Sequence, residues 1–441
     1  MRKFLSSLII SLLMAAVSFA SDAVPGDVIV VLRNTSGSRI SSLSQEGGIK
    51  SLSAVKSFAK SSNVSIKSTY DALSEQGDYM FMLVHSDSKD ENTLLREIKS
   101  RPDVIAASLN RTSKLLEDVK TPNDPQYYQL WGMEAINAPY AWNFGTGSND
   151  VYVAVIDSGV DYEHEDLRDN FSHEYSRNFV GYGSSDYDPS TYQDVHDHGF
   201  HVSGTIAAVG NNGKGVAGVN WKAKIISLRV ADSRGRVYEA SVIAALDYIV
   251  RLLRNNPAMN LAAANLSLGG WDSVSPEKMA SEPYALAFKT LSDTDRTVIC
   301  VAAGNEAHEI GVPAPDDDED KRISRGQYGY PASLQNIDNM IVVAASNSSL
   351  ARANYFSNYS RNYVDIGAPG DEIYSSVRTK ASTDMGYDAF ERLNAYDIKS
   401  GTSMATPHVT GAAALLKAIY PDAKAHEIKA ALIGGANGDY L

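Results

Sequence analysis

Four polar side chains in this sequence stand beside apolar or helical runs, where they could do chemistry. Asp157 ends the apolar stretch 151–156, and Asn305 follows a second such stretch. His198 and Ser403 each stand at the start of a stretch with helical spacing. A serine nucleophile, a histidine base and a carboxylate that orients the histidine catalyse acyl transfer, and an amide can donate to the developing oxyanion. Each segment alone is also typical of a turn or a helix cap, so the inference depends on all four occurring together.

A histidine cluster leaves a second chemistry open. His196, His198 and His201 lie close together, and the last two are one helical turn apart in a helix. With Asp194 or Asp197 as a further ligand, this spacing is compatible with a metal site. The alternative is that His198 is a catalytic base at the start of a helix and that His201 is structural.

The elements that must position these side chains can be predicted from the apolar pattern of the later part of the chain. Apolar runs predict strands over 151–156, 224–230, 262–268, 298–303 and 340–345, and helical spacing predicts helices over 198–209, 241–254, 402–420 and 426–432. Near-continuous apolar strands between helices indicate an α/β fold, a mostly parallel sheet with helices on both faces. Active sites in such sheets form at the carboxyl ends of the strands, where Asp157 and Asn305 are placed.

The region before these elements has a different pattern, and we expect it to form a separate unit. Strands are predicted over 26–33, 64–73, 79–85 and 104–109, and helices over 51–60 and 91–99. This β-α-β-β-α-β order is that of a small α+β ferredoxin-like domain. A polar stretch over 110–124 would link the two units, and we place the boundary between residues 118 and 119.

Residues 1–20 are typical of an export signal. Arg2 and Lys3 precede a mostly apolar stretch, and Ser18 and Ala20 place small side chains where a signal peptidase cleaves. We therefore expect a secreted protein, extracellular or periplasmic. A retained membrane anchor is the alternative, although the apolar stretch is short for a bilayer span. After removal of the signal, we expect no association with a membrane.

The composition argues against several classes of protein. The chain has 441 residues, enough for two folded units, and a formal net charge of -13. An acidic chain is a poor nucleic-acid binder, because phosphate contact requires clustered Lys and Arg. The single cysteine, Cys300, excludes an intrachain disulfide and a cysteine-based zinc site, and it lies in an apolar run typical of a buried strand.

Five segments together resemble those of the subtilisin-like serine proteases, and they occur in that family's order, Asp before His before Ser. They are Val-Ile-Asp-Ser-Gly, His-Gly-Phe-His-Val-Ser-Gly-Thr, Asn-Leu-Ser-Leu-Gly-Gly, Ala-Ala-Gly-Asn and Gly-Thr-Ser-Met-Ala-Thr-Pro-His. The resemblance covers the chain from Asp124 onward. It implies that Ser403 attacks the scissile carbonyl to give an acyl-enzyme, that His198 passes the proton to the leaving amine, and that Asp157 orients the imidazole. It also implies that the Asn305 side chain and the Ser403 amide bind the oxyanion.

The same resemblance implies a site for protein or peptide substrates. A strand expected to pair with the substrate backbone consists of Ser267, Leu268 and Gly269. The pocket for the side chain before the cut is expected to be lined by Gly270, Ala303 and Gly329. Gly329 would leave room for a large apolar side chain. Glu306 and the acidic run 316–320 leave a preference for Lys or Arg open.

Three oxygen-bearing side chains resemble the ligands of a structural calcium site, the one cofactor expected here. They are Asp124, Asp166 and Asn212, the last in the Asn- and Gly-rich loop 210–215. Carboxylate and amide oxygens suit a hard cation. The loop alone is equally typical of a plain turn.

By resemblance, residues 21–118 would be a propeptide and residues 119–441 the catalytic domain of a self-processing zymogen. Such a propeptide assists folding and inhibits the enzyme until the chain is cut, here expected between residues 110 and 120. The sequence departs from the family pattern in two places. It stops at Leu441, sooner after the serine than is usual, which raises the expectation of a truncated C-terminus. The stretch 306–329 is longer and more acidic than in the simplest members.

Three other functions stay open at this point. A catalytically inactive binding protein could share the fold, although all four residues of the expected site are present. A lipase-like acyl hydrolase would show Gly-x-Ser-x-Gly around its nucleophile, which Ser403 lacks. A metal hydrolase would use the histidine cluster instead.

Overall fold

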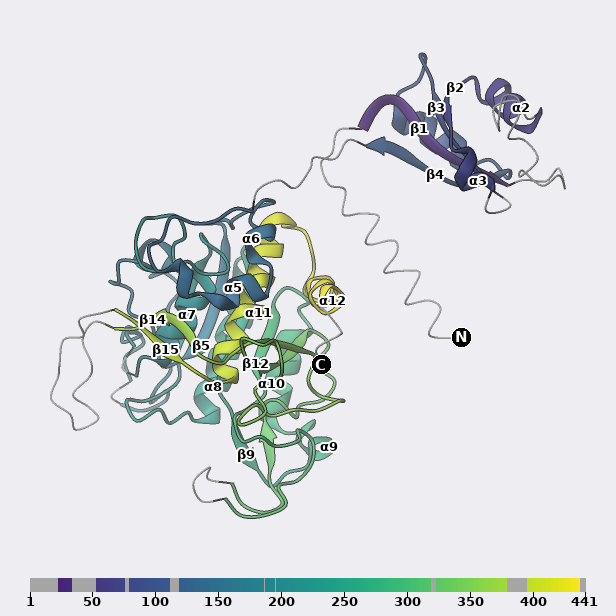
Figure 1. Cartoon of the computed structure of the whole chain (residues 1–441). Helices are drawn as coiled ribbons and strands as arrows, with labels where there is room; N and C mark the ends of the chain where they lie inside the picture. The colour runs from purple at the N-terminus through teal and green to yellow at the C-terminus, as the bar shows by residue number, and fades with distance from the viewer. Residues whose placement is uncertain are drawn as a thin grey trace. The chain divides into compact units, whose positions relative to one another are not determined.

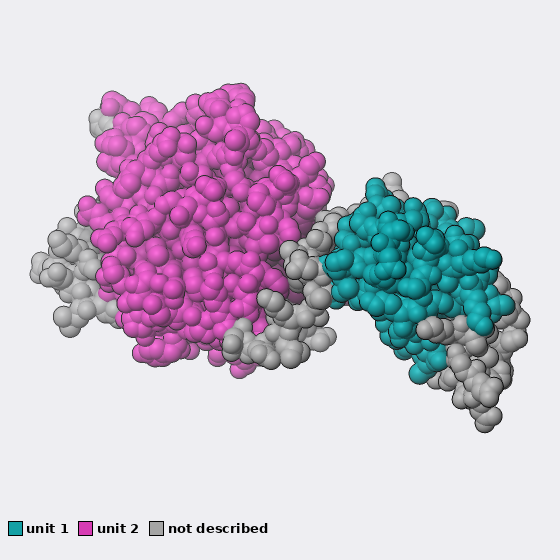
Figure 2. All heavy atoms as spheres, turned by 90° about the horizontal axis from the view of Figure 1, so that it is seen from above, with its two compact units in different colours: residues 1–117 teal, residues 118–441 magenta. Residues whose placement is uncertain are grey.

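The computed structural model describes residues 23–33, 53–75, 79–111, 119–185, 187–194, 196–318, 323–378 and 395–436. The chain divides into two compact units, residues 1–117 and 118–441, one residue before the boundary expected from the sequence (Figures 1 and 2). The predicted signal peptide, residues 1–20, lies outside the described residues and stays a prediction. Within the described ranges, no helix is both long and apolar enough to cross a membrane.

The N-terminal unit is a four-stranded antiparallel sheet with helices, in the order β2-β3-β1-β4. Its elements are β1 (Ala23–Arg33), α2 (Ser53–Ser62), β2 (Ser65–Thr69), α3 (Asp71–Glu75), β3 (Tyr79–His85), α4 (Glu91–Lys99) and β4 (Val104–Arg111). The ferredoxin-like prediction is confirmed. One boundary was wrong. The strand predicted over 64–73 ends at Thr69, because Asp71 begins the short helix α3, and an acidic residue is favourable in the first turn of a helix.

A buried carboxylate joins all four strands of this sheet. Asp27 of β1 is 1% exposed and accepts hydrogen bonds from Lys67 of β2 (3.0 Å) and Asn110 of β4 (3.0 Å). His85, the last residue of β3, places Nδ1 2.7 Å from the same carboxylate. Burial opposes the ionisation of Asp27, but these partners outweigh burial and lower the pKa of Asp27 below its ordinary 3.8. The ionised form of Asp27 therefore links the four strands.

The C-terminal unit is built on a seven-stranded parallel sheet in the order β13-β12-β10-β8-β5-β7-β6. Its strands are β5 (Val151–Asp157), β6 (Arg177–Asn178), β7 (Lys224–Arg229), β8 (Asn260–Leu266), β10 (Val298–Ala302), β12 (Met340–Ser346) and β13 (Ile366–Pro369). The predicted parallel α/β sheet is confirmed. Cys300 lies in β10 and is fully buried, as its apolar surroundings predict.

Helices cover both faces of this sheet, because alternate strand residues point to opposite sides. Val155 of β5 shares a core with Phe200 of α7, whereas its neighbour Ile156 shares another core with Leu246 of α8 and Phe288 of α10. The long helices are α7 (His198–Ala207), α8 (Glu239–Asn255), α10 (Pro283–Ser292) and α11 (Thr402–Ile419). Helix α11 packs against α7 and against β8, β10 and β12 (Figure 1).

Shorter elements complete the C-terminal unit. They are η3 (Tyr127–Gln129), α5 (Trp131–Ala135), α6 (Ala138–Ala141), η4 (Arg168–Asn170), β9 (Gly270–Asp272), α9 (Pro276–Met279), β11 (Tyr328–Tyr330), β14 (Ile373–Ser376), β15 (Tyr396–Lys399) and α12 (Ala425–Gly435). β9 pairs with β11, and β14 pairs with β15, both antiparallel. These two pairs lie outside the main sheet and supply residues near the site.

Candidate active site

Asp157 and His198 meet where strand β5, next to the central strand β8, ends and helix α7 begins. His198 Nδ1 lies 2.8 Å from Asp157 Oδ1 and 3.0 Å from Oδ2. Asp157 is only 4% exposed, and its Oδ1 also accepts the backbone N–H of Ser158 (2.7 Å). A carboxylate only accepts hydrogen bonds, so Nδ1 must carry the proton. Nε2 is then the ring atom left to act as a base.

The surroundings of His198 set its protonation. Burial of the ring opposes the charged form, but the charge of Asp157 and the hydrogen bond to it outweigh this effect and raise the pKa of His198 above its ordinary 6.5. The side chain keeps 28% of its surface exposed. The imidazole can therefore be reached from solvent, and the imidazolium that forms on proton transfer is stabilised.

Two polar residues fix the start of α7 against the end of β5. Ser158 donates its hydroxyl to Asp194 (2.9 Å) and accepts the backbone N–H of Gly199 (2.9 Å). The fully buried Asp194 carboxylate also accepts the N–H of His196 (2.7 Å), just before the helix, and that of Phe200 (3.0 Å), which the first turn of the helix leaves unpaired. Ser158 directly follows Asp157. The hydrogen bonds of Ser158 and Asp194 therefore set the distance between Asp157 and His198. The sequence did not predict this role for either residue.

His201 anchors a different part of the unit. It is fully buried, and its Nε2 lies 3.0 Å from the carbonyl of Ile373 in β14 and 3.2 Å from that of Asp397 in β15. Carbonyls accept hydrogen bonds, so this nitrogen is a donor and cannot bind a metal. Burial lowers the pKa of His201 to about 3, so the ring is neutral. Asp197, another ligand considered for a metal, pairs with Arg378 (2.8 Å).

Ser403 is the second residue of α11 and lies beside the end of β8. Its hydroxyl donates to the carbonyl of Ser267 (3.2 Å), and the hydroxyl of Ser267 donates to the carbonyl of Ser403 (2.9 Å). A serine hydroxyl has one hydrogen. Transfer of this proton to His198 therefore requires rotation of the Ser403 side chain away from Ser267.

Thr402 fixes the orientation of the Asn305 amide. Asn305 Oδ1 accepts both the backbone N–H (2.7 Å) and the hydroxyl (3.0 Å) of Thr402. The hydroxyl of Thr402 also accepts the N–H of Gly304 (3.0 Å), and Thr402 is fully buried. Because the amide oxygen is held by two donors, the Nδ2 end of the exposed Asn305 is left for another partner. The sequence offered no signal for this role of Thr402 beyond its place next to Ser403.

A small space faces two hydrogen-bond donors beside the serine. A Cβ atom added to Gly401 would lie 3.5 Å from Asn305 Nδ2 and 3.6 Å from the backbone nitrogen of Ser403. Glycine at 401 therefore leaves open a position close to both donors, which is also 3.6 Å from Asn305 Oδ1. Two convergent donors at the N-terminus of a long helix suit an oxyanion.

The residues expected to bind substrate come directly after β8 and in the strand pair β9–β11. Ser267 is buried directly after β8, and Leu268, Gly269 and Gly270 become progressively more exposed. β9 and β11 pair with Gly329 opposite Trp271, which places Gly270 and Gly329 on neighbouring strands. A Cβ atom on Gly329 would lie 3.7 Å from the Trp271 indole, and one on Gly270 would meet no atom within 4 Å. Both positions thus offer space to a ligand.

Asn358, which sequence reasoning missed, holds the remaining residues of this region. The buried Ala303 lies at the end of β10, and its carbonyl accepts Asn358 Nδ2 (3.0 Å). The same amide group donates to Glu306 (2.6 Å), and Asn358 Oδ1 accepts the N–H groups of Glu306 and His308. Glu306 is therefore held by Asn358. Of the acidic run, residues 319 and 320 lie outside the described residues.

The three residues expected to bind calcium come together around one loop. Asp124 accepts the N–H groups of Asn211 (2.6 Å) and Asn212 (3.2 Å), and Asp166 accepts Asn212 Nδ2 (2.8 Å) and the N–H of Val216 (2.8 Å). Burial, with a contribution from the charge of Asp124, raises the pKa of Asp166 to about 7. Two buried carboxylates that repel each other fit a hard cation.

The amide oxygen of Asn212 is not free to bind a cation in this conformation. Asn212 Oδ1 accepts the N–H of Lys214 (2.7 Å), so its amide would have to turn to offer that oxygen to an ion. Among the described residues, no group of three or more His, Cys, Asp or Glu side chains is placed to hold a metal ion.

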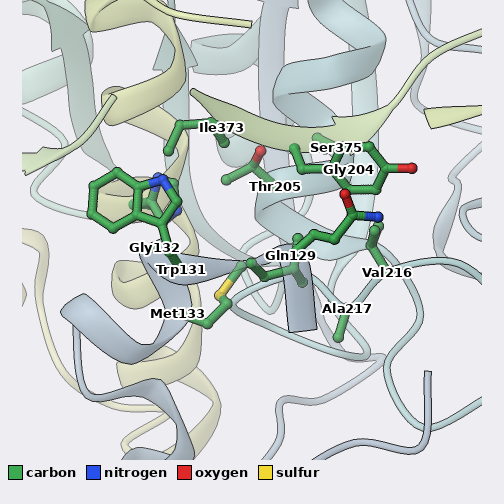
Figure 3. A pocket seen from close by; sticks show the side chains of 13 residues that line it. Gln129, Trp131, Gly132, Met133, Gly204, Thr205, Val216, Ala217, Ile373 and Ser375 are labelled. Carbon is green, nitrogen blue, oxygen red and sulfur yellow. The ribbon is translucent and has the colours of Figure 1, made fainter. Parts of the chain in front are cut away.

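A separate small cavity lies between α5, α7 and β14 (Figure 3). Trp131, Met133, Thr205, Ile373 and buried His408 are among its lining residues, and none of the residues of the candidate triad lines it. Burial lowers the pKa of His408 to about 4, so this ring is neutral. The cavity is therefore separate from the candidate triad.

Comparison with known proteins agrees with this geometry. Residues 148–440 match the model of the subtilase family. An extracellular protease of Xanthomonas campestris is 31% identical over 366 residues, 76% of this chain and 56% of that protein. An intracellular serine protease of Paenibacillus polymyxa is 35% identical over 286 residues, 65% of this chain and 72% of that protein.

A solved structure gives the same result for the fold. A protease from Pseudoalteromonas arctica superposes with a TM-score of 0.57 at 28% identity, over 72% of this chain and 93% of the other. The chain spans little more than half the length of the Xanthomonas protease. The family match covers the sheet, both candidate catalytic helices and all four residues of the expected site. This chain therefore belongs to the subtilase family, the subtilisin-like serine proteases.

Proposed function

We propose that this protein is a secreted serine endopeptidase that cleaves peptide bonds through an acyl-enzyme. Ser403 would attack the scissile carbonyl while His198 Nε2 takes its proton, and Asp157 would stabilise the imidazolium. The oxyanion would occupy the space beside Gly401, where Asn305 Nδ2 and the Ser403 N–H donate to it. His198 would then give its proton to the leaving amine, and water would release the acyl group. The 2.8 Å contact between Asp157 and His198, with Nε2 left as the base, carries this proposal.

The substrate would lie along the strands that follow β8. Its backbone would pair with Ser267, Leu268 and Gly269 as an added strand, which requires no particular side-chain sequence. The side chain before the cut would enter the space between Gly270, Ala303 and Gly329. A large apolar side chain is the expected preference, because the Trp271 indole lies beside Gly329 and Glu306 is already held by Asn358.

The N-terminal unit would be a propeptide. In this account residues 1–20 are the export signal, residues 21–118 form the inhibitory and folding-assisting propeptide, and residues 119–441 form the catalytic domain. The charged and apolar pattern of residues 1–20 supports secretion. The relatives include two proteases named extracellular and one named intracellular, so their names alone do not decide, and residues 1–20 are the feature that favours export.

A calcium ion would stabilise the catalytic domain. Asp124, Asp166 and Asn212 would hold it, and it would neutralise the repulsion between the two buried carboxylates. Binding to the folded state alone would add stability by mass action.

Self-processing tests the proposed function. Residues 21–441 are produced and purified as the parent and as the variants Ser403→Ala, Asn305→Ala and Ser349→Ala, the last an exposed serine as control. The parent and Ser349→Ala should separate into two fragments on a denaturing gel over time, and Ser403→Ala should remain one chain. Asn305→Ala should mature about 10²–10³-fold more slowly, because one oxyanion donor is lost. Maturation of Ser403→Ala at the parent rate would contradict the proposal.

A further inference from the structure

A lysine lies close to the candidate base on a different element. Lys399 is the last residue of β15, four positions before Ser403, and it pairs in register with Ile373 of β14. The carbonyls of Ile373 and Asp397 both accept the ring nitrogen of His201, one helical turn after His198. The hairpin end that carries Lys399 is therefore fixed to the same helix as the base.

This lysine has no ion-pair partner among the residues that the structure describes. Lys399 is half-buried, and it makes none of the ion pairs found among the described residues. The carboxylate of Asp157 contacts His198, and that of Asp397, two positions before Lys399 on β15, accepts the N–H of Ile398. Burial and the charge of Lys399 both act to lower the pKa of His198, against the opposing effect of Asp157.

The position of Lys399 relative to the substrate follows from its element. The residues that would hold the acyl part, Ser267 to Gly270 and Asn305, follow strands β8 and β10. Lys399 instead belongs to the hairpin that is bonded through His201 to α7, the helix that begins with the imidazole that would protonate the leaving amine. Its element is therefore joined to the helix of the base, and its charge acts on that base.

We propose that Lys399 is a specificity-determining residue that favours an acidic side chain just after the scissile bond. A half-buried ammonium attracts a carboxylate more than a neutral amide of the same shape. This inference rests on the proposed function, because it assumes that the peptide bond is cut at Ser403.

Matched peptides test the inference. Fluorogenic peptides share one sequence before the cut and carry either Glu or Gln at the first two positions after it. Four processed enzymes are compared at pH 8.5, where His198 is to act as a base. They are the parent and the variants Lys399→Gln, Lys399→Glu and Lys222→Gln. Lys222 is an exposed lysine just before β7, at the amino-terminal edge of the sheet, and serves as the control.

The ratio of kcat/KM for the Glu peptide to that for the Gln peptide is the readout. We expect this ratio to be about 2 to 5 in the parent and in Lys222→Gln, because a partly exposed charge pair contributes in that range. The ratio should shrink as salt is added, fall to about 1 in Lys399→Gln, and invert in Lys399→Glu. In Lys399→Gln the acid limb of the pH profile should also move to higher pH, since a cation near His198 is removed.

The outcomes separate this inference from the proposed function. Equal ratios in the parent and in Lys399→Gln would overturn the role of Lys399 while leaving the endopeptidase intact. A parent that cleaves neither peptide would contradict the proposed function, and with it this inference.

Discussion

Asp157 Oδ1 and His198 Nδ1 lie 2.8 Å apart although 41 positions separate them in the chain. Because an ionised carboxylate only accepts hydrogen bonds, this contact fixes the tautomer of the imidazole. In Asp157→Asn the side-chain amide could donate a hydrogen bond to Nδ1. The ring proton would then move to Nε2, which could no longer accept the serine proton. We expect kcat to fall by about 10⁴-fold, the loss typical of this change in serine-protease triads. Asp169→Asn, an exposed residue of η4, is the control. Steady-state kinetics on a chromogenic peptide measure both, and a loss below tenfold in Asp157→Asn would contradict the assignment.

The pH profile should report the same contact. The pKa of His198 is raised above 6.5, mainly because Asp157 outweighs burial, and only the neutral imidazole accepts the serine proton. The kcat/KM of the processed enzyme should therefore rise with pH and reach half of its maximum above pH 6.5. An acid limb centred below that value would show that the charge of Asp157 does not dominate the environment of His198.

Thr402 should act on turnover through Asn305. Thr402→Val removes the hydroxyl that donates to Asn305 Oδ1 and accepts from Gly304, so the amide is less firmly oriented. We expect kcat to fall by more than tenfold, but by less than the roughly 10²–10³-fold of Asn305→Ala. Thr402→Ser keeps the hydroxyl and should retain most of the activity. A Thr402→Val enzyme with parental kcat would mean that the backbone N–H alone orients Asn305.

Calcium should stabilise the protein more at high pH than at low pH. The pKa of Asp166 is raised from 3.8 to about 7 by burial, so without a cation its contribution to stability is lost as pH rises through about 7. A bound cation would offset the cost of ionising the buried Asp166 carboxyl group. The increase in Tm between excess chelator and excess calcium should therefore be larger at pH 8 than at pH 6, and should disappear in Asp166→Asn. Equal Tm values with calcium and with chelator at pH 8 would rule out this site.

The N-terminal sheet should depend on the ionised form of Asp27. Because the pKa of Asp27 is lowered in the folded unit, its contribution to stability is present above 3.8 and is lost as pH falls below it. Asp27→Asn should weaken all four strands together, since Lys67, His85 and Asn110 share this carboxylate. Hydrogen exchange of β1 to β4 at pH 7, in the unprocessed Ser403→Ala chain, measures the effect. Faster exchange confined to β1 would contradict the shared role.

The sequence predicted the elements that carry long apolar patterns. The strands β5, β7, β8, β10 and β12 and the helices α7, α8 and α11 were each predicted to within a few residues, because burial on both faces leaves an uninterrupted apolar run. Helix α7 ends before the predicted residue 209 because the N–H of Val209 bonds to the carbonyl of Asp166. Helix α10 was missed, as were the short strands β9, β11, β14 and β15, which are too brief to show a period.

The polar frame of the site could not be predicted from spacing. Ser158 and Asp194 are 36 positions apart, and Asn305 and Thr402 are 97 apart. Short polar side chains that meet across such distances leave no periodicity, and each resembles an ordinary turn or cap residue. Lys399 likewise has no sequence signal, because its proximity to His198 arises only when the hairpin packs on α7.

Covalent labelling of the processed enzyme identifies its nucleophilic serine. A fluorophosphonate reacts with a serine that a neighbouring base activates, and it leaves one stable adduct that mass spectrometry can locate after digestion. We expect a single adduct on the peptide that contains Ser403, slower labelling after His198→Ala, and no adduct on Ser403→Ala protein cut in trans by the parent. An adduct on a different serine, or equal labelling of the Ser403→Ala protein, would show that Ser403 is not the nucleophile.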